Sequence, residues 1–272
     1  MSDLQLPAPA SLALLAAASV AAGAVNSVAG GGTILTFPVL AAILPDGPGR
    51  AVAANATSTI GIWPGAIASA WAYRGERAGL PPWARWLMLP SIVGAAVGVA
   101  LVLWLPPRWF AAAVPWLILL AALLFAAQPR LARLVPPGGG GDSVGRGRLA
   151  AAGLAQCCVA IYGGYFGAGI GILMLAVLGL LGLGDIHRLN GVKNVLGTAI
   201  NGVASAVFTL GAVAGRHDVS WPCVAVMAAG SVTGGLLGSA FARRLPAPVV
   251  RRGVAIIGFA LAAYYLWRHN LG

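Results

Sequence analysis

The chain consists of ten runs of apolar residues that short polar or glycine-rich segments separate. A run of about 20 apolar residues is the length that an α-helix needs to cross a bilayer. The pattern therefore predicts an all-α integral membrane protein whose helices are these runs. By residue number they are 10–25, 31–44, 51–72, 84–104, 109–127, 149–163, 168–183, 191–213, 221–241 and 250–267.

Two pairs of neighbouring runs are joined only by glycine-rich breaks. The first break lies in NSVAGGGTILTFPVL, residues 26–40, and the second lies in YGGYFGAGIGILMLAVL, residues 162–178. Glycine weakens a helix, and a broken helix in an apolar environment leaves backbone groups unpaired. We expect each pair to form a helical hairpin whose second arm, at about 14–16 residues, is short for a full crossing.

The arginines favour hairpins over continuous crossings. Positively charged residues in short loops accumulate on the cytoplasmic side of a membrane. If each pair turns back, twelve arginines share one side and four lie on the other, whereas continuous crossings would split them nine to seven. With hairpins, both chain termini are extracytoplasmic, and the four outer arginines are Arg50, Arg108, Arg216 and Arg268.

The second half of the chain repeats the first at a spacing of 138 residues, which aligns 32–40 with 170–178 and Arg50 with Arg188 without a gap. Each repeat is a glycine-broken hairpin followed by three crossing helices. Because three is odd, the second repeat enters from the opposite face, the inverted topology common in secondary transporters. The predicted organisation within one membrane domain is a first repeat at 1–128, a cytoplasmic linker at 129–148 and a second repeat at 149–272.

Inverted repeats bring the two hairpins toward the middle of the bilayer from opposite faces. At each break, the second arm begins with backbone N–H groups that lack helical partners, and such groups favour an anion. They are tolerated at membrane depth where they line a polar cavity inside the protein. The other explanation for glycine, close packing of helices, fits Gly94, Gly98, Gly234, Gly235 and Gly238.

Composition supports a membrane protein and argues against several function classes. The chain is 59% hydrophobic and 8% charged, against roughly 25% charged residues in soluble domains. Its net charge of +11 comes mainly from arginines between the apolar runs, which indicates topology rather than a nucleic-acid interface. The six carboxylates, at positions 3, 46, 76, 142, 185 and 218, all fall in predicted loops or termini. We find no nucleotide-binding loop, catalytic constellation or metal-ligand cluster, and expect neither enzyme activity nor a cofactor.

The two breaks, with RAVAANATST (50–59) and RLNGVKNVLGTAIN (188–201) after them, resemble the TauE/SafE family of sulfite and organosulfur anion exporters. The likeness covers essentially the whole chain as two halves. It implies a plasma-membrane permease for a small sulfur-containing anion, such as sulfite, a sulfonate or thiosulfate. In the second half, Ala168 and Ile170 interrupt the glycines, so Tyr162 and Tyr165 are expected to help shape that hairpin.

Lys193 is the only lysine and the main candidate for contact with an anion. An ammonium inside a bilayer is costly and usually functional, although a lysine near a helix end can also reach back to the interface. Its counterpart in the first repeat is Asn55. Amides and hydroxyls give an oxyanion hydrogen-bond donors, and their alternative role is bonding between helices. The candidate substrate-binding residues are Asn26, Ser27, Gly31, Gly32, Thr33, Asn55, Thr57, Ser58, Tyr162, Tyr165, Gly167, Gly169, Lys193, Asn194, Thr198 and Asn201.

These features favour a multi-pass transporter that exports a small sulfur-containing anion, driven by membrane potential or by ion coupling. An inside-negative potential contributes ~2.3 kcal/mol per charge per 100 mV toward export of an anion. The alternatives are a passive anion channel and an exporter of another small solute. The expected partners are the small oxyanion and the lipid bilayer, without nucleic acid. Small residues mark packing within and between chains alike, so the sequence does not decide whether the protein is a homodimer.

Overall fold

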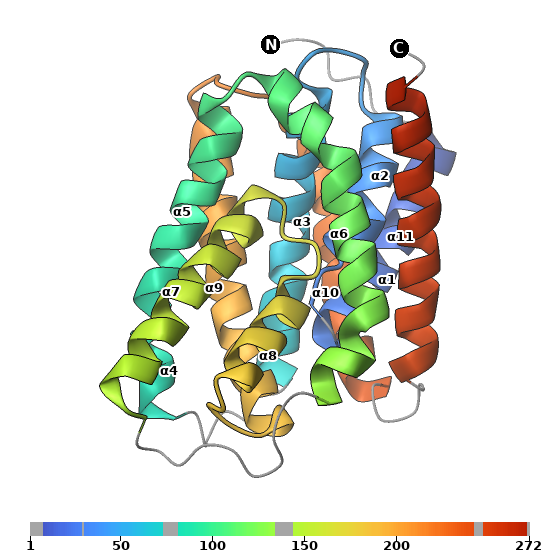
Figure 1. Cartoon of the computed structure of the whole chain (residues 1–272). Coiled ribbons are helices and arrows are strands. Elements are labelled where there is room, and N and C mark those ends of the chain that lie inside the picture. The colour runs from blue at the N-terminus through green and yellow to red at the C-terminus, as the bar shows by residue number, and fades with distance from the viewer. Residues whose placement is uncertain (1–7, 29, 73–80, 134–143, 242–246, 271–272) are drawn as a thin grey trace.

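The structure is a computed structural model that describes residues 8–28, 30–72, 81–133, 144–241 and 247–270. The regular structure in these residues is entirely helical, and the helices form one bundle (Figure 1). This confirms the predicted all-α class, and the helix ends fall within a few residues of the apolar runs. The helices are α1 Pro9–Val28, α2 Thr33–Ile43, α3 Arg50–Ala72, α4 Pro82–Trp86, α5 Met88–Trp104, α6 Pro107–Arg133, α7 Arg146–Tyr165, α8 Ile170–Leu180, α9 Ile186–Val213, α10 Trp221–Phe241 and α11 Ala247–Asn270.

Five segments of the described chain are long and apolar enough to cross a membrane: Pro9–Ser27, Pro82–Trp104, Pro107–Arg133, Arg188–Val213 and Trp221–Gly238. Helix α3 has 23 residues but is less apolar, with a first half rich in buried polar side chains. Polar side chains of this kind are tolerated in a membrane protein because they face other helices rather than lipid.

The helices α1 and α2 form a hairpin, and so do α7 and α8. The second arms α2 and α8 have 11 residues each, which corresponds to about 16 Å of helix and is well short of the ~30 Å hydrocarbon core. Helix α1 begins and α2 ends at one end of the bundle, whereas α7 begins and α8 ends at the other (Figure 1). The two hairpins therefore enter the bundle from opposite ends and turn inside it.

The contacts between helices pair up when the two halves of the chain are exchanged. Helix α1 packs against α10 as α7 packs against α5, and α2 touches α11 as α8 touches α6. Helix α3 packs against α10 as α9 packs against α5, and the counterparts α3 with α9 and α6 with α11 contact each other directly. This pattern is what two repeats with a pseudo-twofold relation would show; their inverted orientation in the membrane remains a prediction.

Glycine allows the equivalent interfaces of α1 with α10 and of α7 with α5 to close. A Cβ on Gly234 would lie 2.0 Å from the Val20 carbonyl oxygen of α1, and a Cβ on Gly98 would lie 2.1 Å from the Ile161 carbonyl oxygen of α7. Small residues let membrane helices approach backbone to backbone. Close packing, the second explanation offered for the glycines, is thus confirmed at both positions.

The described arginines separate by end of the bundle. Arg50, Arg108, Arg216 and Arg268 belong to the end where α1 begins and α11 finishes (Figure 1). The opposite end carries Arg85, Arg130, Arg133, Arg146, Arg148, Arg188, Arg251 and Arg252. Arg74, Arg77, Arg243 and Arg244 lie outside the described residues. The predicted linker overlaps α6 and α7 at its two ends, and its central residues, 134–143, are also outside the described part, so the domain boundaries remain a prediction.

Candidate functional site

The two glycine breaks meet in the interior of the bundle. Gly31 has a φ of 113° and Gly169 a φ of 78°, backbone conformations that favour glycine. A Cβ on Gly31 would lie 2.1 Å from the Gly169 backbone nitrogen, and a Cβ on Gly30 would lie 3.0 Å from the Gly171 Cα. Glycine is therefore needed at this crossing for its conformation and for the absence of a side chain. We refer to the contact of 30–31 with 169–171 as the glycine crossing.

Side chains near the glycine crossing fix the shape of each hairpin. The Gly31 N–H donates to Asn26 Oδ1 at 2.9 Å, and the Tyr162 hydroxyl donates to the Ala168 carbonyl oxygen at 2.5 Å. Asn55 Nδ2 donates to the Tyr165 carbonyl oxygen at 3.0 Å, which ties α3 to the end of α7. Neither α2 nor α8 has a side-chain cap at its first turn, so both second arms begin with uncapped positive dipole ends.

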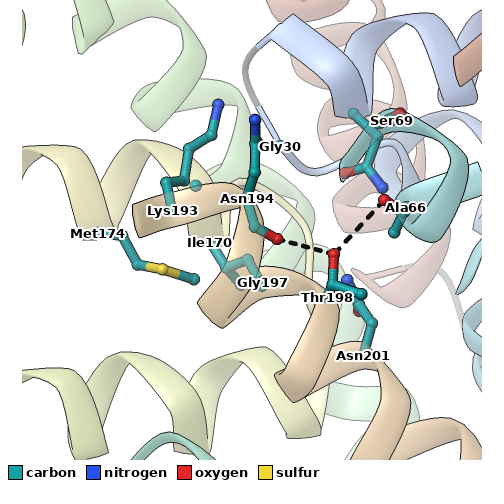
Figure 2. A pocket seen from close by; sticks show the side chains of 12 residues that line it. Gly30, Ala66, Ser69, Ile170, Met174, Lys193, Asn194, Gly197, Thr198 and Asn201 are labelled. Atoms are coloured by element: carbon teal, nitrogen blue, oxygen red, sulfur yellow. Dashed lines mark hydrogen bonds between the residues drawn. The ribbon is translucent and has the colours of Figure 1, made fainter. Parts of the chain in front are cut away.

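A polar cavity lies beside the glycine crossing, between α3, α8 and α9. In Figure 2, Lys193 and Met174 lie on one side of it, with Ala66 and Ser69 on the other. The cavity has a volume of about 30 Å³, room for about two water molecules. Its full lining is Asn26, Gly30, Ala66, Ser69, Ile170, Gly171, Met174, Lys193, Asn194, Gly197, Thr198 and Asn201. We call it the Lys193 cavity.

The Lys193 cavity combines one positive charge with neutral polar groups. Lys193 is only 3% exposed, although its helix begins at the end of the bundle. Among the described residues that line the cavity, it carries the one formal charge, and this lining contains no carboxylate. An ammonium in a site of low dielectric attracts an anion far more strongly than it would in water. The amides of Asn26, Asn194 and Asn201 add hydrogen-bond donors without adding charge.

Three further polar atoms converge at the second break. A Cβ on Gly167 would lie 3.2 Å from the Gly163 carbonyl oxygen, 3.7 Å from Thr33 Oγ1 and 3.9 Å from Asn201 Oδ1. Gly167 has a φ of 82°, which a residue with a side chain rarely adopts. Because Gly167 has no side chain, space remains next to Asn201, which also lines the Lys193 cavity. The second break and the cavity are therefore adjacent.

The structure brings together five of the predicted site residues in the Lys193 cavity: Asn26, Lys193, Asn194, Thr198 and Asn201. Gly31, Gly32, Thr33, Gly167 and Gly169 form the breaks next to it, where Tyr162 and Tyr165 make the contacts described above. The candidate list did not contain Gly30, Ala66, Ser69, Ile170, Gly171, Met174 or Gly197, although Gly30 and Gly171 belong to the predicted breaks. These residues are small or apolar, and only Ser69 carried a polar signal, at the less polar end of α3.

Other predicted residues make contacts away from the Lys193 cavity. Thr57 Oγ1 accepts a hydrogen bond from the Ser220 backbone N–H at 3.1 Å, and the Ser58 and Thr36 hydroxyls lie 2.7 Å apart. The Ser27 hydroxyl donates to the Ala24 carbonyl oxygen within α1 at 2.8 Å. Asn55 is fully buried beside the second break, and its Oδ1 has no hydrogen-bond partner. Asn55, Thr57 and Ser58 join α3 to neighbouring elements, the alternative role that their chemistry allows, whereas Ser27 bonds within its own helix.

A bundle of apolar helices around a buried, positively charged polar cavity defines a multi-pass membrane transport protein. The family model for the sulfite exporter TauE/SafE matches residues 15–265, and the chain belongs to that family. A probable membrane transporter protein of Haemophilus influenzae (strain ATCC 51907 / DSM 11121 / KW20 / Rd) is 28% identical over 258 residues, with 93% of each chain covered. Probable membrane transporter protein ORF9 of a Sinorhizobium sp is 27% identical over 259 residues, with 92% of this chain and 90% of that protein covered. The family is one of membrane transporters, so the protein is a transporter and not an enzyme.

Proposed function

We propose that the protein carries a small sulfur-containing oxyanion across the plasma membrane and binds it in the Lys193 cavity. The observation that supports this most directly is the composition of the cavity. A buried ammonium and three amides line a space without a carboxylate among its described lining residues, while the Ser69 and Thr198 hydroxyls donate to the Gly65 and Asn194 carbonyl oxygens. An oxyanion needs positive charge and several hydrogen-bond donors in a dry site, and the ammonium and the amides supply both.

The family description supports a sulfur oxyanion over other anions. That description is sulfite exporter, and sulfite, thiosulfate and short sulfonates share a small head of polar oxygens on sulfur. Such a head requires donors from several directions, which the cavity offers from Asn26 of α1 and from Lys193, Asn194 and Asn201 of α9. The names of the two relatives state transport without a substrate.

Membrane potential suffices to drive export of an anion through this site. Asp46, Asp185 and Asp218, the carboxylates in the described residues, all lie between helices. Asp3, Glu76 and Asp142 lie outside the described residues. Potential alone contributes ~2.3 kcal/mol per charge per 100 mV, so a uniporter requires no coupling ion. The small volume of the Lys193 cavity favours a carrier over an open channel, because an anion larger than two waters must displace the surrounding helices to pass.

The test is anion flux in proteoliposomes with an imposed potential and no proton or sodium gradient. Sulfite, thiosulfate and a short sulfonate are compared for saturable, potential-dependent flux. Lys193→Met keeps much of the length and apolar stem of the side chain but removes its charge. We expect it to weaken binding by about 10- to 100-fold, since a hydrogen bond to a charged group contributes ~1.5–3 kcal/mol.

The matched control is Arg130→Met, which removes the same charge from an exposed position in α6. We expect its flux to equal that of the parent protein. Equal flux and affinity in the Lys193→Met variant would reject the Lys193 cavity as the binding site. Absence of potential-dependent flux of every sulfur anion in the parent would reject potential-driven export.

A further inference from the structure

A second, larger cavity lies at the end of the bundle away from Lys193. It has a volume of about 590 Å³ and lies between α2, α3, α6 and α11. Gly47 and Pro48, in the loop between α2 and α3, form part of its wall, and Tyr264 is 48% exposed beside it. It therefore reaches the surface at the end where α2 finishes and α3 begins. Arg50 lines it and forms an ion pair with the exposed Asp46.

Four aromatic side chains pack together next to this second cavity. The Phe37 ring lies 5.4 Å from the Phe166 ring and 6.4 Å from the Phe110 ring, centroid to centroid. The Phe110 ring also lies 5.3 Å from the Tyr165 ring. Phe37, Phe110 and Phe166 are each 1% exposed. We call Phe37, Phe110, Tyr165 and Phe166 the aromatic barrier.

The aromatic barrier is continuous with both cavities. On one side, Phe37 itself lines the second cavity. On the other side, Phe166 lies at the end of α7, directly before the second break. Gly169 of that break contacts Gly31, and Gly30, the neighbour of Gly31, lines the Lys193 cavity. The barrier side chains come from α2, α6 and the α7–α8 hairpin. A relative shift of these elements would therefore separate the rings.

The repeats do not place a second aromatic barrier at the other end. At the spacing of 138 residues, Phe37 aligns with Leu175 and Tyr165 aligns with Ser27. Ring pairs contribute ~0.5–1.5 kcal/mol beyond their burial, so aromatic packing stabilises closure beside the second cavity, and Leu175 and Ser27 supply no such rings at the aligned positions.

We propose that the aromatic barrier is the closed gate between the Lys193 cavity and the second cavity, and that the second cavity is the other half of the substrate pathway. The identity of the substrate rests on the proposed function, but the gate itself is a property of the geometry. In the state described, the Lys193 cavity is separated by the barrier from the end of the bundle that carries Arg50. Opening the gate connects the two cavities.

The test is the sidedness of thiol labelling. Cys157, Cys158 and Cys223 are free thiols and are first replaced by alanine. Ser69→Cys then places a thiol in the Lys193 cavity, and Ala41→Cys places one in the second cavity. A membrane-impermeant methanethiosulfonate is applied to intact cells and to inside-out vesicles. We expect the two thiols to be labelled from opposite sides.

Barrier variants follow in the Ser69→Cys background. Phe37→Ala and Phe110→Ala each remove a ring, and we expect the thiol at position 69 to lose its one-sidedness and to be labelled from both faces. The matched control is Phe208→Ala. Phe208 is a fully buried phenylalanine of α9 that packs against His217 outside the barrier. It creates a cavity of similar size, and we expect labelling to remain one-sided.

Labelling of position 69 from both faces in the parent protein would overturn the proposal, and so would one-sided labelling that both barrier variants retain. The parent comparison decides the matter even if one barrier variant fails to assemble, and the second variant guards against that loss. Labelling requires no transport, so an absence of sulfur-anion flux would reject the proposed function and leave this result intact.

Discussion

Asn26 connects the fold of the site to its chemistry. Its Oδ1 accepts the Gly31 N–H at the first break, and the residue also lines the Lys193 cavity. An acceptor oxygen is all that the hairpin needs from this side chain, whereas an anion needs the cavity to stay free of negative charge. These two requirements can be separated by substitution.

Asn26→Asp retains the acceptor and adds a negative charge next to the lysine. We expect the variant to keep its thermal stability in detergent but to bind sulfite or thiosulfate at least about tenfold more weakly. The aspartate and the anion would both be negative in the same cavity, and their repulsion costs ~1.4 kcal/mol or more. Binding is measured by calorimetry on the purified protein, and unfolding by a thermal scan.

Asn26→Ala provides the complementary result. It removes the acceptor without adding charge, and leaving the Gly31 N–H without its partner costs about 1–3 kcal/mol of folding stability. A lowered Tm with residual anion binding is expected. If Asn26→Asp bound the anion as tightly as the parent, Asn26 would have a structural role alone.

Polar residues inside apolar runs could be predicted as site candidates, but their roles could not. Lys193 and Asn201 are visible in the sequence because a polar side chain is costly in a membrane helix. Thr57 and Ser58 carry the same signal, yet their hydroxyls bond to Ser220 and Thr36. Both uses employ the same donors, so the sequence alone cannot separate them. Met174 is apolar and gave no signal at all.

Among the elements, the two hairpins determine where the site lies. Gly31→Ala would force a side chain into a φ of 113° and place its Cβ 2.1 Å from the Gly169 nitrogen. A left-handed conformation alone costs a non-glycine residue of order 1–3 kcal/mol, and the clash adds to that. We expect a large loss of Tm or failure to assemble, measured by fluorescence-detected size exclusion and a thermal scan.

Gly47→Ala is the matched control for the glycine crossing. Gly47 lies in the loop after α2, and a Cβ there would meet nothing within 4 Å. We expect its free energy of unfolding to remain within about 0.5 kcal/mol of that of the parent protein, with little change in Tm. Equal stability of the two alanine variants would show that the backbones at the breaks are not held together as described.

The apolar pattern predicted which segments form helices, but the residues at which these helices begin and end were less predictable. The run predicted at 109–127 corresponds to α6, which continues to Arg133. The polar residues after 127 ended the run in the sequence, whereas basic side chains in the last turn stabilise a helix end through its dipole. For α7, the apolar run begins at 149, whereas the helix begins at Arg146. Here the helix extends beyond the apolar residues at its first turn.

At the scale of the molecule, the two halves of the chain make equivalent helix contacts but carry different side chains at equivalent positions. The packing of α1 on α10 and of α7 on α5 was implied by the repeat. The location of the site was not, because Lys193 aligns with Asn55 and only one of the two positions carries a charge. In the described residues, the charged cavity and the aromatic barrier thus lie at positions whose repeat equivalents differ, and in the proposed pathway this difference distinguishes its two ends.

The orientation of the molecule in the membrane can be decided from charge and tested directly. Eight of the described arginines lie at one end and four at the other, and positive loops favour the cytoplasm. We predict that the chain termini and the Arg50 end face outward, so that the Lys193 cavity lies toward the cytoplasm. A phosphatase that is active only after export, fused behind Gly272, should be active, while the same enzyme inserted within 134–143 should be inactive.

A fluorescent protein that matures only in the cytoplasm, placed at the same two positions, is the converse control. The opposite pattern for both reporters would invert the molecule, and the aromatic barrier would then close the cytoplasmic rather than the outer half of the pathway.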